Sequence, residues 1–196
     1  MYIKKKIAAI ALAVISLLAA GQVPAAGADD SASAVAVAEK AATELMTALK
    51  TELQAAMRKG GPVAAIDICS TRAQALSAEI PGRSNRPDVT VKRTSLKFRN
   101  PANRPTPEEE RVLRNFAAQL QEGAALQPTT RRTNTALHYY RPILTEPLCL
   151  SCHGDPDHMD TAVLEALRQR YPEDMAAGYN AGELRGMVSV TVPAAP

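Results

Sequence analysis

The sequence predicts an α+β fold in one domain. Its first part is rich in Ala, Leu, Glu and Lys at helical spacing, as amphipathic helices are. The later segments 88–95, 134–141 and 186–192 alternate apolar and polar residues, as strands do. Helices followed by strands mixed with further helices are typical of the α+β class.

The first residues of the chain match the pattern of an export signal. Lys4, Lys5 and Lys6 precede an apolar run from residue 7 to 20, and Ala26-Gly27-Ala28 fits the cleavage pattern of small residues. Cleavage after Ala25 is the alternative site. The run is short of the roughly 20 residues of a membrane span, so an uncleaved anchor is the weaker alternative. We therefore expect a signal peptide at 1–28, a periplasmic domain at 29–196, and no stable membrane insertion after cleavage.

The mature chain is close to neutral. The whole sequence has a formal charge of +3, but residues 29–196 contain 20 Lys and Arg and 20 Asp and Glu. This balance gives no basis for a nucleic-acid partner. The 168 residues are enough for one compact core.

The helical part divides in two at Gly60-Gly61. A first helix is predicted over 31–58, and a second from Pro62 to about Glu79, where Pro81-Gly82 ends it. A third helix begins at Thr106, where Glu109 completes a capping box, and ends near Gly123. A short fourth helix is predicted over about 160–170. The segment 97–105 is expected to be irregular.

The decisive motif is Cys149-Leu150-Ser151-Cys152-His153. In a C-x-x-C-H sequence the two thiols attach a haem as thioethers, and the His ligates the iron. We therefore predict one covalent haem c, held by Cys149 and Cys152, with His153 bound through Nε2 while a carbonyl or water holds Nδ1–H. Gly154-Asp155-Pro156 should interrupt regular structure directly after it. The alternatives are a zinc site, for which only Cys69, His138 and His158 remain, and a redox disulfide, which normally lies in a thioredoxin-like unit that is not recognisable here.

The second iron ligand is less determined by local sequence. Cys69 is the thiol left over from the haem motif, and it suits either iron ligation or burial as a small apolar side chain. Further candidates are weaker on local sequence, because each has an ordinary role in a core or on a surface: His138, His158, Met159, Met175 and Met187.

Basic and amide side chains between strand and third helix are candidates for the haem propionates. Guanidinium groups pair well with carboxylates. These candidates are Arg93, Lys97, Arg99 and Arg104, with Asn100 and Asn103 bonding there or holding the turn. Residues that can line the porphyrin are Tyr139, Ile143, Leu148 and Leu150.

Several segments together resemble a bacterial family of single-haem c-type proteins with a PAS-like fold. They are Ile68-Cys69, the stretch 93–103 with Arg99-Asn100-Pro101, the motif 149–154, and the tail from Tyr171-Pro172 to Gly186. The resemblance covers the mature chain in the family's order. It implies a PAS-like antiparallel sheet with long N-terminal helices, and a Cys/His pair of axial ligands in which Cys69 lies opposite His153. Related domains occur as sensory modules and as standalone secreted proteins.

Three functions are compatible with these features. The first is a redox- or gas-responsive sensor, for which CO, NO or a periplasmic redox protein would be the partner. The second is a periplasmic electron-transfer cytochrome, although the late motif differs from the common arrangement with a Met ligand well after it. The third is an enzyme, and we expect none, because no acid/base pair suited to peroxidase chemistry is recognisable.

Overall fold

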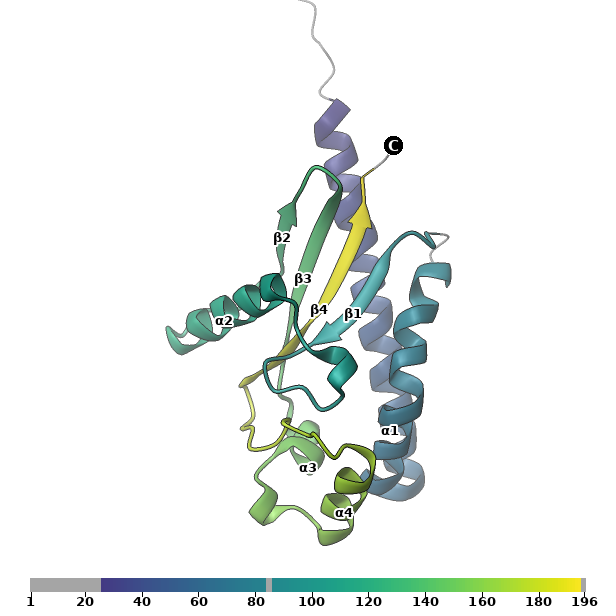
Figure 1. The fold of residues 1–196 in the computed structure, drawn as a ribbon, viewed down its shortest axis with the longest axis vertical. Helices are drawn as coiled ribbons and strands as arrows, with labels where there is room; N and C mark the ends of the chain where they lie inside the picture. The colour runs from purple at the N-terminus through teal and green to yellow at the C-terminus, as the bar shows by residue number, and fades with distance from the viewer. Residues whose placement is uncertain (1–25, 84–85, 195–196) are drawn as a thin grey trace, which may run out of the picture.

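The computed structural model describes residues 26–83 and 86–194, with side chains from residue 32 onward, so most of the predicted signal peptide lies outside the described residues. Four strands form one antiparallel sheet in the order β1-β4-β3-β2, as the α+β prediction requires. The long helix α1 covers one face, and α2 packs on the other (Figure 1). The segment 145–183 lies beyond one end of the sheet, beside the bend of α1 (Figure 1).

Helix α1 (Ala26–Arg83) is two helices that meet at a sharp bend. Gly60 and Gly61 leave helical geometry there, and Gly61 has a φ of 66°, a conformation that glycine adopts without strain. The predicted break is therefore confirmed. The second arm runs on to Arg83 rather than ending near Glu79, because Pro81 lies in the last turn and removes only one backbone hydrogen bond there.

The three predicted strands are present. They are β1 (Thr90–Thr94), β3 (Ala136–Leu144) and β4 (Leu184–Pro193), and β4 pairs with both of the others. Strand β3 is longer than predicted and continues through Pro142. Strand β2 (Thr129–Arg132) was not predicted, because all four residues are exposed and polar, and a strand without an apolar face shows no alternation.

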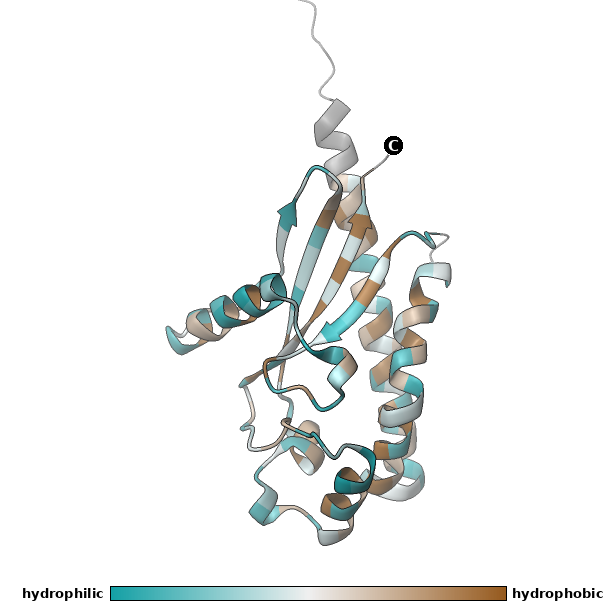
Figure 2. Cartoon of the chain, viewed as in Figure 1, coloured by the Kyte–Doolittle hydropathy of each residue, from teal (hydrophilic) through white to brown (hydrophobic). Residues whose placement is uncertain are grey.

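The two faces of the sheet bury separate cores. Both arms of α1 contribute Ala and Leu side chains, Leu45 and Leu76 among them, to one buried cluster with Tyr139 and Val190. The hydropathy colouring shows hydrophobic positions along both α1 and the strands that it covers (Figure 2). On the other face, α2 (Pro107–Gln121) places Phe116 against Tyr140. Adjacent residues on a strand point to opposite faces, which explains why Tyr139 and Tyr140 belong to different cores.

Helix α2 begins as predicted. Thr106 Oγ1 accepts a hydrogen bond from Glu109 N at 3.2 Å, and Glu109 Oε2 accepts one from Thr106 N at 2.8 Å. Helix α4 (Thr161–Arg170) also lies where expected and packs Val163 and Leu167 on Ile66 of α1. Of the helices that the structure describes, none combines the length and apolar character needed to cross a membrane.

Candidate functional site

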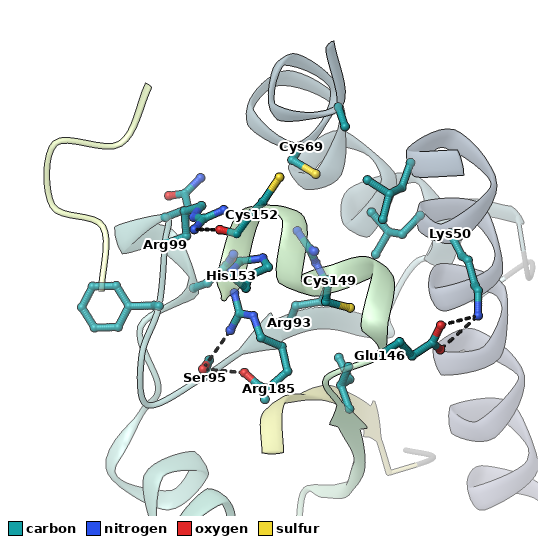
Figure 3. A pocket seen from close by; sticks show the side chains of 18 of the residues that line it. Lys50, Cys69, Arg93, Ser95, Arg99, Glu146, Cys149, Cys152, His153 and Arg185 are labelled. Carbon is teal, nitrogen blue, oxygen red and sulfur yellow. Dashed lines mark hydrogen bonds and ion pairs between the residues drawn. The ribbon is translucent and has the colours of Figure 1, made fainter. Parts of the chain in front are cut away.

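A pocket of about 250 Å³ lies between the two arms of α1, the end of the sheet and the segment that carries the C-x-x-C-H motif (Figure 3). One face of the first α1 arm forms an apolar wall with Met46, Leu49, Leu53 and Met57. The pocket is lined by most of the residues predicted for the site, among them Cys69, Arg93, Arg99, Asn100, Cys149, Cys152 and His153. Residues separated by 84 positions in the sequence therefore meet in one place.

The motif lies in a single short turn. Residues Pro147–Cys149 form the 3-10 helix η2, and Leu150–His153 form the four-residue helix α3. Gly154 ends it, with its N–H donating to Leu150 O at 3.0 Å. A Cβ at position 154 would lie 2.7 Å from that same oxygen, so this close turn needs glycine. The break predicted after the motif is confirmed.

His153 is held by the loop 174–179. Its Nδ1 is 2.7 Å from Ala176 O, and its own carbonyl accepts from Tyr179 N at 2.9 Å. Burial, with the nearby charges of Arg185 and Arg99, lowers the pKa of His153 well below its usual value. The ring is therefore neutral at pH 7, and a carbonyl acceptor requires the proton on Nδ1. Nε2 is left with a free lone pair.

Cys69 projects from the second arm of α1 on the wall across from α3 (Figure 3). Its side chain is solvent-accessible, but it lies in a recess with protein on most sides. This burial raises the pKa of the Cys69 thiol, while the charges of Arg93, Arg99 and Arg185 act to lower it. A thiol at this position faces a strongly positive wall.

Three guanidinium groups make that wall positive. Arg185 donates to Ser95 Oγ at 3.1 Å, and Arg99 pairs with Asp174 at 2.9 Å. The Nε of Arg93 is buried and has no hydrogen-bond partner among the residues that the structure describes. Among the described residues, Asp174 is the one carboxylate that pairs with any of these three arginines. The wall thus carries more positive charge than the protein itself neutralises.

Several predicted residues have other roles. Lys97 and Arg104 are exposed and outside the pocket lining, where they lie over the rings of Tyr179 and Phe98. Asn100 Oδ1 accepts from Ala102 N at 2.9 Å, which holds the turn before η1 (Pro101–Asn103).

The predicted lining is partly right. Asn103, Ile143 and Leu148 line the pocket, but Leu150 does not, and Tyr139 belongs to the core beneath α1. Because β3 alternates its side chains, Tyr139 and Ile143 share a face, and only Ile143 is far enough along the strand to reach the pocket.

The competing ligands lie elsewhere in the described part of the chain. His138 Nδ1 is 3.1 Å from Thr191 Oγ1 on the sheet, and exposed His158 is 2.9 Å from Asp155. Met187 is fully buried in the α2 core, Met159 packs beside α4, and Met175 is 51% exposed. None of these five lines the pocket.

Sequence reasoning missed Arg185, Asp174 and Ala176. Arg185 stands at the start of β4, directly before the alternating valines, and nothing local separates it from a surface arginine. Asp174 and Ala176 act from an irregular loop, Ala176 through its backbone carbonyl alone. A backbone acceptor leaves no mark in a side-chain pattern, so only the folded chain reveals it.

Comparison with known proteins identifies the family. The family model described as Tll0287-like matches residues 26–193. No protein with a curated description matches the chain. A similar solved structure is that of the cyanobacterial heme-protein Tll0287, with a TM-score of 0.58, 23% identity, and coverage of 84% of this chain and 95% of that chain. At this identity the structural likeness establishes a shared fold. The match over nearly all described residues shows that the chain belongs to the Tll0287-like family.

Proposed function

We propose that this chain is an exported protein that carries one covalent haem and acts as a redox- or gas-responsive sensor. The observation that carries the proposal is the meeting of the C-x-x-C-H motif, Cys69 and three arginines around one apolar pocket. The similar cyanobacterial structure is of a heme-protein, which supports the same assignment.

The chemistry of the pocket fits a porphyrin that bears two carboxylates. The apolar wall of α1 suits the ring, and the buried arginines suit the propionates. Removing a guanidinium from water without a partner is costly, so a buried Arg93 Nε with no acceptor favours an anionic ligand. Arg93 and Arg185 are the best placed of the three, since Arg99 already pairs with Asp174.

The motif residues would hold the group covalently. Each thiol of Cys149 and Cys152 would add its sulfur and its hydrogen across a vinyl double bond, which forms a thioether and releases nothing. His153 presents Nε2 as the iron ligand because Nδ1–H is engaged by Ala176 O. Haem would supply a one-electron iron centre that also binds diatomic gases.

Cys69 is the proposed second ligand, as the family resemblance implies. An anionic sulfur favours the oxidised metal. Burial raises the pKa of the Cys69 thiol, the charges of Arg93, Arg99 and Arg185 act against this rise, and a bound ferric iron would supply the further attraction that favours the thiolate. One-electron reduction of a bound iron would weaken its attraction for this sulfur, so Cys69 would be released more readily in the reduced state. A change of ligand of this kind suits a sensor better than a carrier, which works best when its ligands stay in place. We propose no catalytic activity.

Location follows from the predicted leader and from the chemistry. Free thiols at a C-x-x-C-H motif are converted to thioethers by maturation systems outside the cytoplasm, so a periplasmic site agrees with the signal predicted at 1–28.

The test uses protein produced in a bacterium with an active cytochrome maturation system. Mass spectrometry should find the polypeptide plus one haem, and Cys69→Ala should change the ferric visible and low-temperature EPR spectra. Ser70→Ala is the matched control, because Ser70 Oγ donates to Asp67 O of the same helix and is not among the residues that line the pocket. A protein at the bare polypeptide mass would refute the haem assignment.

Spectra of the reduced protein distinguish a sensor from an electron-transfer cytochrome. A sensor should lose the Cys69 bond on reduction and bind CO or NO. An electron-transfer cytochrome, the alternative, should keep both ligands in both oxidation states. Identical spectra of the reduced protein with and without CO would therefore favour the carrier.

A further inference from the structure

Arg99 connects three segments that meet behind His153. Its Nε donates to Asp174 Oδ2 at 2.9 Å, and its Nη2 donates to Cys152 O at 2.5 Å and Ala176 O at 3.1 Å. The side chains of Arg99 and Asp174 are only 10% and 15% exposed. Three charge-assisted contacts thus join the strand-to-η1 segment, α3 and the 174–179 loop.

Asp174 completes the arrangement from the loop side. Its Oδ1 accepts from Ala176 N at 2.7 Å, while its Oδ2 is paired with Arg99. Both the N–H and the C=O of Ala176 are therefore directed by this ion pair. A second backbone bond, from Met175 N to Phe98 O at 3.2 Å, keeps the loop beside the segment of Arg99.

The carbonyl of Ala176 is shared between Arg99 and His153. It accepts from Arg99 Nη2 at 3.1 Å and from His153 Nδ1 at 2.7 Å. We propose that Arg99, through Asp174 and Ala176, is a positioning residue that fixes His153 with its proton on Nδ1 and its Nε2 toward the pocket. This inference deepens the proposed function, on which its use for iron ligation rests.

The charges of the pair have opposite effects on the metal side. Arg99 places a positive charge, and Asp174 a negative charge, beside the loop that holds His153, and a nearby charge changes the relative stability of the two oxidation states of the iron. Loss of the Arg99 charge should stabilise the oxidised iron and shift the midpoint potential to more negative values. Loss of the Asp174 charge should shift it to more positive values. If Arg99 and Asp174 only held the fold together, loss of either partner would disturb the site in the same way, and the two midpoint potentials would shift in the same direction.

The primary measurement is ¹⁵N NMR of histidine-labelled protein in the reduced form under CO, because ferrous haem is then low-spin whether CO or Cys69 is the second ligand. It compares the parent with Arg99→Gln, Arg99→Lys and Asp174→Asn. Arg104→Gln is the matched control, because Arg104 is an exposed arginine of the same segment outside the pocket lining. The His153 Nδ1–H should exchange slowly in the parent and in the control. Arg99→Gln removes several buried contacts, so exchange there should be faster by roughly tenfold or more.

Arg99→Lys separates charge from geometry. Lysine keeps the positive charge but lacks the planar fork, so we expect faster exchange with a midpoint potential close to that of the parent. Arg99→Gln and Asp174→Asn should move the potential in opposite directions. Parent-like exchange in Arg99→Gln, or shifts of the same sign in both variants, would overturn the inference.

The two proposals can fail separately. If mass spectrometry finds no haem, the proposed function fails, and the tautomer of His153 is then read from ¹⁵N shifts of the full chain as isolated. If the proton of His153 stays on Nδ1 in Arg99→Gln and exchanges at the rate seen in the parent, the proposed role of Arg99 is refuted, whether or not the protein carries haem. A proton that moves to Nε2, or exchanges roughly tenfold faster, would support it.

Discussion

Gly186→Ala should destabilise the protein at the place where β4 approaches Thr94 and Ser95. Gly186 lies in β4 where the strand passes β1, and it lines the pocket. A Cβ at this position would lie 2.4 Å from Thr94 O and 3.1 Å from Ser95 Cβ. To restore a contact of 3.0 Å, the two strands would have to separate by at least 0.6 Å. The clashing atom is a backbone oxygen, so no side-chain rotation can relieve it.

The expected loss follows from two opposing effects. Insertion of a methyl group into close-packed structure costs about 1–3 kcal/mol, and the lower entropy of alanine in the unfolded chain returns about 0.4–1 kcal/mol. We therefore expect the free energy of unfolding to fall by about 1–2 kcal/mol, which lowers Tm by roughly 2–8 °C for a chain of this size.

Urea denaturation followed by circular dichroism measures this change. The matched control is Gly82→Ala, because Gly82 lies in the last turn of α1 and a Cβ there meets no atom of the described part of the chain within 4 Å. The control should be neutral or more stable by up to about 1 kcal/mol, since alanine favours helix over glycine. Equal stability of Gly186→Ala and the parent would refute the close approach of β4 to Thr94.

Three further changes test other parts of the fold. Phe116→Ala should lower the free energy of unfolding by about 3–5 kcal/mol, because Phe116 is 2% exposed in the α2 core; urea curves measure this. Glu109→Gln should cost about 2 kcal/mol at pH 7. Burial raises the pKa of Glu109, but hydrogen bonds from Thr106 N and Lys92 outweigh it and leave the pKa lowered, so this contribution is lost as the pH falls through that value, and parent and variant should converge in acid. Lys50→Ala should change stability by less than about 0.5 kcal/mol, because its pair with Glu146 joins side chains that are 51% and 58% exposed. A large loss in Lys50→Ala, or parent-like curves for the other two, would contradict these assignments.

Local patterns predicted most of the secondary structure. The bend at Gly60-Gly61, the capping box of Thr106 and Glu109, and three of the four strands follow from residue type and spacing over a few positions. These signals are reliable because helix caps, glycine conformations and strand alternation depend on neighbours in sequence. Strand β2 was not predicted, because its pairing with β3 defines this exposed edge strand, and its own polar residues show no alternation of apolar and polar positions.

The residues of the candidate site could be predicted from the sequence, but their contacts could not. The motif at 149–153 and the candidates Cys69, Arg93, Arg99 and Asn100 were recognisable from the sequence. These four candidates line one pocket with Cys149, Cys152 and His153 of the motif. The role of each arginine could not be predicted from the sequence, because its partners depend on distances between segments that lie far apart in the chain. Only the fold assigns Arg99 to Asp174 and brings Arg185 to the wall.

Residue chemistry along the chain thus determined which groups are available: two thiols and an imidazole at attachment spacing, a third thiol, and several guanidinium groups. The tertiary structure decided how they combine, because hydrogen bonds and ion pairs act over a few ångströms and therefore require the chain to bring its distant segments together. The orientation of His153 is the clearest case: its hydrogen-bond acceptor is the carbonyl of Ala176, an alanine whose side chain carries no chemical signal.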